Sequence, residues 1–144
     1  MPHTLNAYLV EDSRLIRENL TAALEEMAAV RIVGWAEGES KAVASLAALS
    51  AAPADHELDL VLIDLMLQQG SGLGVLRAAC GKGPGRHARC VVLTNYATPD
   101  MRRECLKLGA DRVFDKSNEI DALIDYCLSL AKAGPPPTAA AAPV

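Results

Sequence analysis

The sequence predicts an α/β fold, built as a doubly wound parallel sheet of five strands with five helices. Short apolar runs alternate along the chain with longer amphipathic runs. The clearest strand, LDLVLID at Leu58–Asp64, is almost continuously aliphatic, as in strands that are buried on both faces of a parallel sheet. Alternating strands and helices form such a sheet with helices on both faces, because each crossover is right-handed.

The first half of the chain supplies two strands, each followed by a helix. An aliphatic strand at Leu5–Val10 precedes an amphipathic helix at Ser13–Ala28. A strand at Arg31–Ala36 precedes an Ala- and Leu-rich helix at Glu39–Ala51, which ends before Pro53. The apolar face predicted for the first helix consists of Ile16, Leu20, Ala23, Leu24 and Met27.

The second half begins with the strand Leu58–Asp64. A Gly-Ser-Gly segment at residues 70–72 then opens a short helix that runs to Cys80, and a glycine-rich loop follows at residues 81–85. The next strand is Cys90–Thr94.

A fourth helix begins at Thr98, because Thr suits the N-cap and Pro99 suits the first helical position, and it ends at Gly109. The last strand, Asp111–Lys116, leads into a helix that starts at Ser117–Asn118 and continues to residue 131. We expect residues 1–132 to form one domain and the Pro/Ala-rich residues 133–144 to form a flexible tail.

The charge, hydropathy and cysteine spacing of the sequence argue against several classes of function. The net charge of −4 argues against nucleic acid as the main partner, since DNA-binding surfaces need a basic surplus. No apolar run approaches the roughly 20 residues of a membrane span, and the first residues lack a signal peptide pattern, so we expect a cytoplasmic protein. The four cysteines lack the spacing of a zinc site, and we expect them to be buried thiols rather than disulfides.

Polar residues stand at the carboxyl ends of four predicted strands: Glu11 and Asp12, Asp64, Thr94, and Lys116. In a doubly wound sheet the functional crevice lies at these ends. Crowded carboxylates favour a hard divalent cation such as Mg²⁺. With Thr94 and Lys116 available for phosphoryl oxygens, Asp64 becomes a plausible nucleophile toward phosphorus. Each residue alone also fits an ordinary cap, turn or solvated position, but their coincidence at four strand ends indicates a site.

The chain resembles the receiver domain of bacterial two-component response regulators. Four segments carry the resemblance: YLVEDSRLIRENL at 8–20, DLVLIDLMLQQGSG at 59–72, VVLTNY at 91–96 and GADRVFDKS at 109–117. The resemblance covers residues 5–131 and implies a flavodoxin-like sheet of order 2-1-3-4-5. It also implies that Asp64 accepts phosphate. Asp12, Asp64, the backbone carbonyl of Met66 and, through water, Glu11 would hold Mg²⁺, and Thr94 and Lys116 would contact the phosphoryl group.

Several positions depart from the family pattern. Val113 stands where the family has its switch aromatic, so the usual rotamer change cannot report phosphorylation. The neighbouring Phe114 is expected to face the opposite side of the strand, in the core. Asn95 replaces a small residue beside the phosphoryl pocket, and Ser117 and Gln68 replace prolines. Tyr96 either shields the phosphoryl group or is a surface loop aromatic.

The resemblance implies a phosphoprotein that is not an enzyme in the usual sense, since it catalyses only its own Asp phosphorylation and dephosphorylation. Its expected partners are a histidine kinase or phosphotransfer protein and a downstream protein, with no DNA or membrane contact. We expect a single-domain response regulator, because the domain fills the chain up to about residue 132. Two alternatives stay open: a degenerate receiver that binds its partner constitutively, and a Mg²⁺-dependent phosphatase of the haloacid dehalogenase type. Met66 disfavours the latter, which has an acid two residues after its nucleophile.

Overall fold

The computed structural model describes residues 4–50, 58–80 and 88–133. The predicted loop at residues 81–85 and all of the predicted tail after residue 133 lie outside the described residues. Within the described ranges, no helix is both long and apolar enough to cross a membrane.

Five parallel strands form one sheet in the order β2-β1-β3-β4-β5, which confirms the predicted fold class. Strands and helices alternate throughout the chain. The strands are β1 (Leu5–Val10), β2 (Val30–Ala36), β3 (Leu60–Asp64), β4 (Arg89–Thr94) and β5 (Arg112–Asp115). The helices are α1 (Arg14–Met27), α2 (Glu39–Ser50), α3 (Gly72–Ala79), α4 (Pro99–Lys107) and α5 (Ile120–Ala133).

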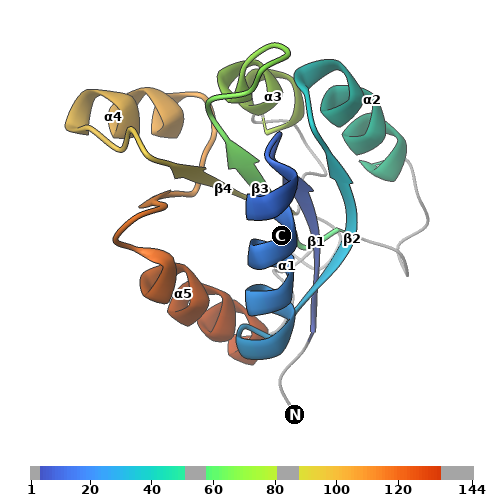
Figure 1. Cartoon of the computed structure of the whole chain (residues 1–144), viewed down its shortest axis with the longest axis vertical. Coiled ribbons are helices and arrows are strands. Elements are labelled where there is room, and N and C mark those ends of the chain that lie inside the picture. Colours follow the sequence, from blue (N-terminus) through green and yellow to red (C-terminus); the bar gives the residue numbers. More distant parts are fainter. Residues whose placement is uncertain (1–3, 51–57, 81–87, 134–144) are drawn as a thin grey trace, which may run out of the picture.

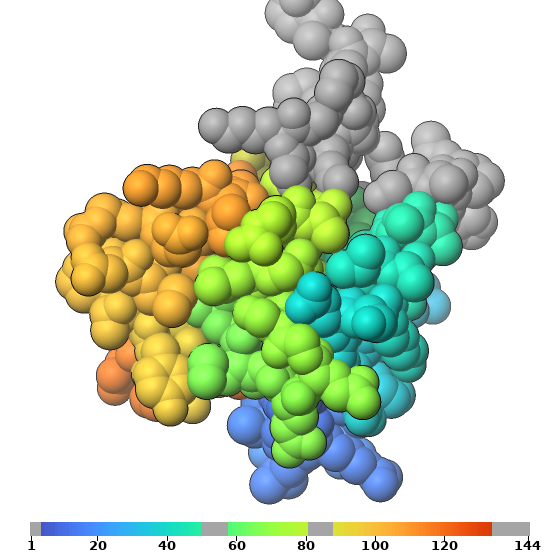
Figure 2. Space-filling view, turned by 90° about the horizontal axis from the view of Figure 1, so that it is seen from above, coloured from blue at the N-terminus to red at the C-terminus, as the bar shows by residue number. Residues whose placement is uncertain are grey.

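The sheet lies between two layers of helices. Helices α1 and α5 cover one face, and α2, α3 and α4 cover the other (Figure 1). On the latter face α3 lies between α2 and α4 (Figure 2). Each face has its own hydrophobic core, and alternation along β5 sends Val113 into the core under α2–α4 and Phe114 into the core under α1 and α5. The expectation that Phe114 belongs to the opposite core is therefore confirmed.

Local sequence signals set the helix starts. The side chains of Ser13, Ser71 and Thr98 cap α1, α3 and α4 by accepting hydrogen bonds from backbone N–H groups of the first turn, and Pro99 opens α4. Gly109, which follows α4, has a φ of +112°, a conformation that favours glycine. These caps fix where each helix leaves the carboxyl end of the sheet.

Two predictions about side chains were wrong. The apolar face of α1 is rotated, because Leu20 and Leu24 are buried but Ile16 and Met27 are exposed, while Arg17 is buried. The cysteines are not all thiols: Cys80 and Cys90 form a disulfide with a Cα–Cα distance of 6.2 Å. Only Cys105 and Cys127 are free and buried among the described residues.

Candidate functional site

The carboxyl ends of β1, β3, β4 and β5 bring the predicted site residues together. Glu11 and Asp12 directly follow β1, Asp64 and Thr94 are the last residues of β3 and β4, and Lys116 directly follows β5. Because parallel strands end at the same edge, five residues from distant parts of the sequence lie in one region. Glu11, Asp64 and Thr94 are buried. Because polar side chains are rarely buried without partners, we expect these three to be hydrogen-bonded or paired.

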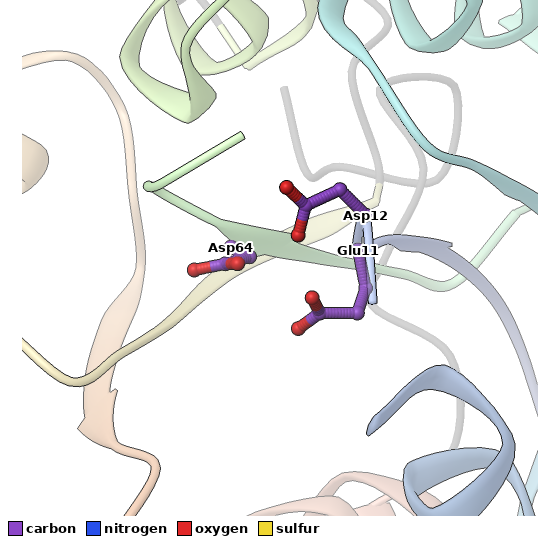
Figure 3. A group of neighbouring side chains, drawn as sticks. All are labelled: Glu11, Asp12 and Asp64. Atoms are coloured by element: carbon purple, nitrogen blue, oxygen red, sulfur yellow. The ribbon is translucent and has the colours of Figure 1, made fainter. Parts of the chain in front are cut away.

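Glu11, Asp12 and Asp64 form an acidic cluster. One carboxylate oxygen from each residue lies within 4.8 Å of the other two. The side chains of Glu11 and Asp12 extend toward Asp64 from the end of β1, so the carboxylates border a common space (Figure 3). Oxygen atoms from three carboxylates at this spacing are the ligands that a hard divalent cation prefers.

Lys116 connects two of these carboxylates. Its ammonium group donates a hydrogen bond to Glu11 Oε1 at 2.5 Å and lies 3.1 Å from Asp64 Oδ2. The Lys116 side chain is only 10% exposed, so water screens these ion pairs weakly. Three carboxylates and one ammonium group leave a formal charge of −2. One Mg²⁺ ion would neutralise this charge.

Burial shifts the acid chemistry of Glu11. Desolvation raises the pKa of this carboxyl above its ordinary value, and the hydrogen bonds from Lys116 and from the Ser13 N–H oppose the shift. The charge of Asp64 raises the pKa further. Ionised Glu11 is therefore an energetically costly group that the cation at Lys116 makes tolerable.

The loop after Asp64 is held by two acidic residues from other elements. The Gln68 N–H donates to Asp12 Oδ2 at 2.9 Å, and the Ser71 N–H donates to Glu39 Oε1 at 2.8 Å. Figure 2 shows this green loop beside the blue start of α1. Met66, whose carbonyl is a predicted metal ligand, lies in this loop, and its N–H donates to Asp64 Oδ1 at 3.3 Å. Hydrogen bonds from this loop therefore reach two of the predicted metal ligands, Asp12 and Asp64.

Thr94 is fully buried at the end of β4. Its hydroxyl oxygen accepts a hydrogen bond from the Tyr96 N–H at 3.0 Å, and its carbonyl accepts one from the Lys116 N–H at 3.0 Å. The side chain of Asn95 accepts a hydrogen bond from the Ser117 hydroxyl at 3.2 Å. Two positions that depart from the family pattern therefore contact each other. Met66 and Tyr96 are both more than half exposed at the rim of the site.

Arg17 supports the site and was not predicted. One guanidinium nitrogen donates to the Glu11 carbonyl at 3.3 Å, and another lies 3.6 Å from the Glu37 carboxylate. The guanidinium carbon also lies 3.8 Å from the centre of the Trp35 ring. Two of these partners, Trp35 and Glu37, are distant in sequence, so helical periodicity alone places Arg17 on the wrong side of α1. Glu39 was missed for the same reason, because nothing near it in the sequence indicates its contact with Ser71.

The donor set fits Mg²⁺. Glu11, Asp12 and Asp64 offer hard oxygen ligands, and the charge that they share is balanced by a divalent cation. The described residues of the site contain no thiolate or imidazole, which softer transition metals prefer.

A family model described as the response regulator receiver domain matches residues 7–127. The photosynthetic apparatus regulatory protein RegA of Rhodobacter capsulatus is 29% identical over 129 residues. That match covers 90% of this chain and 64% of the relative, so the chain spans less than two thirds of the length of this curated relative.

Solved structures have the same fold. The response regulator domain of Thermotoga maritima CheB is similar with a TM-score of 0.73 at 18% identity, over 93% of this chain and all of that domain. A Burkholderia pseudomallei response regulator, solved with a phosphorylated aspartic acid, a calcium ion and citrate, has a TM-score of 0.65 at 26% identity. This match covers 86% of this chain and 66% of that one.

Proposed function

This chain belongs to the response regulator receiver domain family of two-component signalling, and we propose from this premise that Asp64 accepts a phosphoryl group from a histidine kinase or phosphotransfer protein. The observation that carries the proposal is the position of Lys116, which lies 3.1 Å from Asp64 and also binds the buried Glu11. A fixed cation beside a carboxylate at a strand end suits the stabilisation of phosphoryl charge.

The proposed reaction is a phosphoryl transfer. A carboxylate oxygen of Asp64 attacks the phosphorus atom of a phosphohistidine, an oxygen–phosphorus bond forms, and the phosphorus–nitrogen bond of the donor breaks. The imidazole of the donor leaves with the electron pair of that bond. Lys116 and the Thr94 hydroxyl then contact phosphoryl oxygens, and Met66 and Tyr96 border the approach of water from the rim.

Magnesium is part of this proposal. Asp12, Asp64, the Met66 carbonyl and, through water, Glu11 would hold the ion, which neutralises charge on the transferred group when it is bound. The protein groups prepare this site before phosphorylation, because Arg17 and Gln68 fix the Glu11 backbone and the Asp12 side chain. The Burkholderia relative, solved with a phosphorylated aspartic acid and a calcium ion, supports this interpretation by analogy.

We place the protein in the cytoplasm, where it would signal through contact with another protein or pass the phosphoryl group along a relay. Its catalysis would be limited to its own phosphorylation and dephosphorylation. The phosphorylation-dependent surface would consist of α4, β5 and α5, as the family implies.

Incubation with acetyl phosphate and Mg²⁺ tests the proposal. The wild-type chain should gain the mass of one phosphoryl group, and the adduct should be cleaved by hydroxylamine, as acyl phosphates are. Asp64→Asn keeps the side-chain size but removes the nucleophilic oxygen, so it should gain no mass. Asp121→Asn, an exposed change of the same type in the first turn of α5, is the matched control and should label normally. A labelled Asp64→Asn variant, or an unlabelled wild type, would reject the assignment.

A further inference from the structure

Arg102 of α4 holds three segments of the chain at once. Its Nε donates to the Ala97 carbonyl at 3.0 Å, one terminal nitrogen donates to the Val113 carbonyl at 2.9 Å, and the other donates to Glu119 Oε1 at 2.7 Å. These acceptors belong to the β4–α4 loop, to β5 and to the residue that directly precedes α5, respectively. We call Ala97, Arg102, Val113 and Glu119 the Arg102 bridge.

One end of the Arg102 bridge is close to the phosphorylation site along the chain. Ala97 is three residues after Thr94, and the intervening Tyr96 N–H already binds the Thr94 hydroxyl at 3.0 Å. If the Thr94 hydroxyl moves toward a phosphoryl group on Asp64, the short segment 95–97 must change its path. The Ala97 carbonyl is part of that segment, so the change of path would alter its hydrogen bond to Arg102.

The other end leads to the β5–α5 connection. Glu119 Oε1 also accepts a hydrogen bond from the Asp115 N–H at 2.8 Å, and Asp115 Oδ1 accepts one from the Ser117 N–H at 2.7 Å. Asp115 immediately precedes Lys116, which binds Asp64. The Arg102 hydrogen bond lowers the pKa of Glu119, so the carboxylate stays ionised and its bonds stay charge-assisted at neutral pH.

Val113 occupies the position at which the family has an aromatic ring that rotates on phosphorylation. Its side chain is buried, short and apolar, so it has neither the length nor the polar group to link the two ends. The backbone carbonyl of the same residue is instead bound by Arg102. The guanidinium group is rigid and planar. A displacement of the Ala97 carbonyl, the partner of its Nε, therefore turns the whole group and alters its hydrogen bonds to Val113 and Glu119.

We propose that Arg102 is the positioning residue that transmits phosphorylation from the Thr94 loop to the β5–α5 connection, in place of the missing switch aromatic. This inference rests on the proposed function, since it requires a phosphoryl group on Asp64. It assigns the coupling to the fork geometry of the side chain together with its charge-assisted bond to Glu119, so that charge alone is not sufficient. Lysine, which keeps the charge but lacks the fork, should therefore fail to replace Arg102.

The test compares Arg102→Lys with Arg103→Lys. Arg103 is the next residue of α4, is exposed, and pairs with Asp100 inside the same helix, so it controls for charge and helix composition. Each protein is phosphorylated with acetyl phosphate and Mg²⁺, and the extent is measured by intact mass. The response is the change in the backbone amide NMR shifts of Asp115, Ser117 and Glu119 on phosphorylation.

We expect all three proteins to be phosphorylated to the same extent. The shift changes at residues 115–119 should fall by more than half in Arg102→Lys and should be retained in Arg103→Lys. Wild-type responses in Arg102→Lys, or equal losses in both variants, would overturn the inference. Failure of the wild type to gain a phosphoryl group would instead reject the proposed function, together with the inference that rests on it.

A second variant covers the case in which Arg102→Lys does not fold. Glu119→Gln keeps the shape of the acceptor but removes the charge that strengthens its bond to Arg102. Its phosphorylation should match wild type, and its shift changes at Asp115 and Ser117 should be smaller than those of wild type. Unchanged responses in Glu119→Gln would contradict the proposed route to α5.

Discussion

The two ends of the sheet are held together by different kinds of interaction. At the carboxyl end, the buried carboxylates of Glu11 and Asp64 face each other, and the ammonium group of Lys116 joins them. At the amino end, the Cys80–Cys90 disulfide joins the end of α3 to β4. The first arrangement depends on charge balance, so bound ions or phosphoryl groups would alter it, whereas the second is covalent and does not depend on charge.

Close backbone packing also holds the amino end together. A Cβ atom on Gly109 would lie 2.1 Å from the carbonyl oxygen of Cys80, so only glycine fits there. Beside it, the Cys90 N–H donates to Asp111 Oδ2, and the Asp111 N–H donates to the Cys90 carbonyl at 2.7 Å. The amino end is therefore held by a covalent bond and by backbone contacts, whereas the carboxyl end holds buried like charges that need a counter-charge.

The largest expected effect comes from removing the cation at the carboxyl end. Lys116→Met keeps the length of the side chain but leaves Glu11 and Asp64 buried without a counter-charge. We expect the free energy of unfolding to fall by about 3 kcal/mol in the absence of divalent ions. Urea denaturation measures the loss, and added Mg²⁺ should restore part of it. A variant as stable as wild type would mean that charge balance does not hold this end together.

Loss of the disulfide is the corresponding change at the amino end. Replacing both Cys80 and Cys90 with Ala should lower the free energy of unfolding by about 2–3 kcal/mol, because the unfolded chain gains freedom. Phosphorylation by acetyl phosphate should be unaffected, since the bond lies at the opposite end of β4. Thiol titration of the unreduced, denatured wild type should find two thiols, Cys105 and Cys127. Four titratable thiols, or impaired phosphorylation of the double variant, would contradict the separation of the two ends.

The rim of the carboxyl end should control how long the phosphoryl group persists. Met66 and Tyr96 are bulky, uncharged and exposed beside the site, so they exclude water without orienting it. The double change Met66→Asn with Tyr96→Glu should speed dephosphorylation by about tenfold, equivalent to about 1.4 kcal/mol in the barrier. Decay of the phosphoprotein after donor removal measures this rate. Decay at or below the wild-type rate would show that Met66 and Tyr96 do not control dephosphorylation, and Asn95 would be the next residue to test.

The smallest expected effect is a gain. The Asp12 carboxylate accepts a hydrogen bond from the Gln68 N–H. The side-chain amide oxygen of an asparagine could accept the same hydrogen bond. Asp12→Asn therefore keeps this contact and removes one charge from the acidic cluster. In EDTA we expect it to raise the free energy of unfolding by about 1 kcal/mol. Mg²⁺ should stabilise the wild type but not the variant, and equal stabilisation of both would remove Asp12 from the predicted metal ligands.

The sheet and the positions of the site residues could be predicted because each depends on short stretches of sequence. Buried parallel strands are continuous aliphatic runs, and a polar residue at the end of such a run is visible without structural information. The predicted strand Leu58–Asp64 differs from the observed β3 only at its start, where Leu58 and Asp59 precede the ladder. The metal-binding and phosphoryl-binding roles of these residues stay predictions.

Contacts between distant residues account for what could not be predicted. The Cys80–Cys90 bond depends on how α3 returns to the start of β4, and nothing at either cysteine indicates it. Arg17 is buried because it contacts Glu11, Glu37 and Trp35, which lie outside α1. In the Arg102 bridge, Arg102 likewise contacts a residue 17 positions away, Glu119.

The stacking of Arg17 on Trp35 gives the protein an intrinsic optical reporter. Trp35 is the only tryptophan in the chain, the residue is 41% exposed, and the cationic groups of Arg17 and Lys41 lie over its ring. Because the same guanidinium binds the Glu11 carbonyl, a displacement at the acidic cluster alters the electric field at the indole. We therefore expect emission excited selectively at this single ring to follow events at the carboxyl end in real time, in unlabelled protein and by stopped flow.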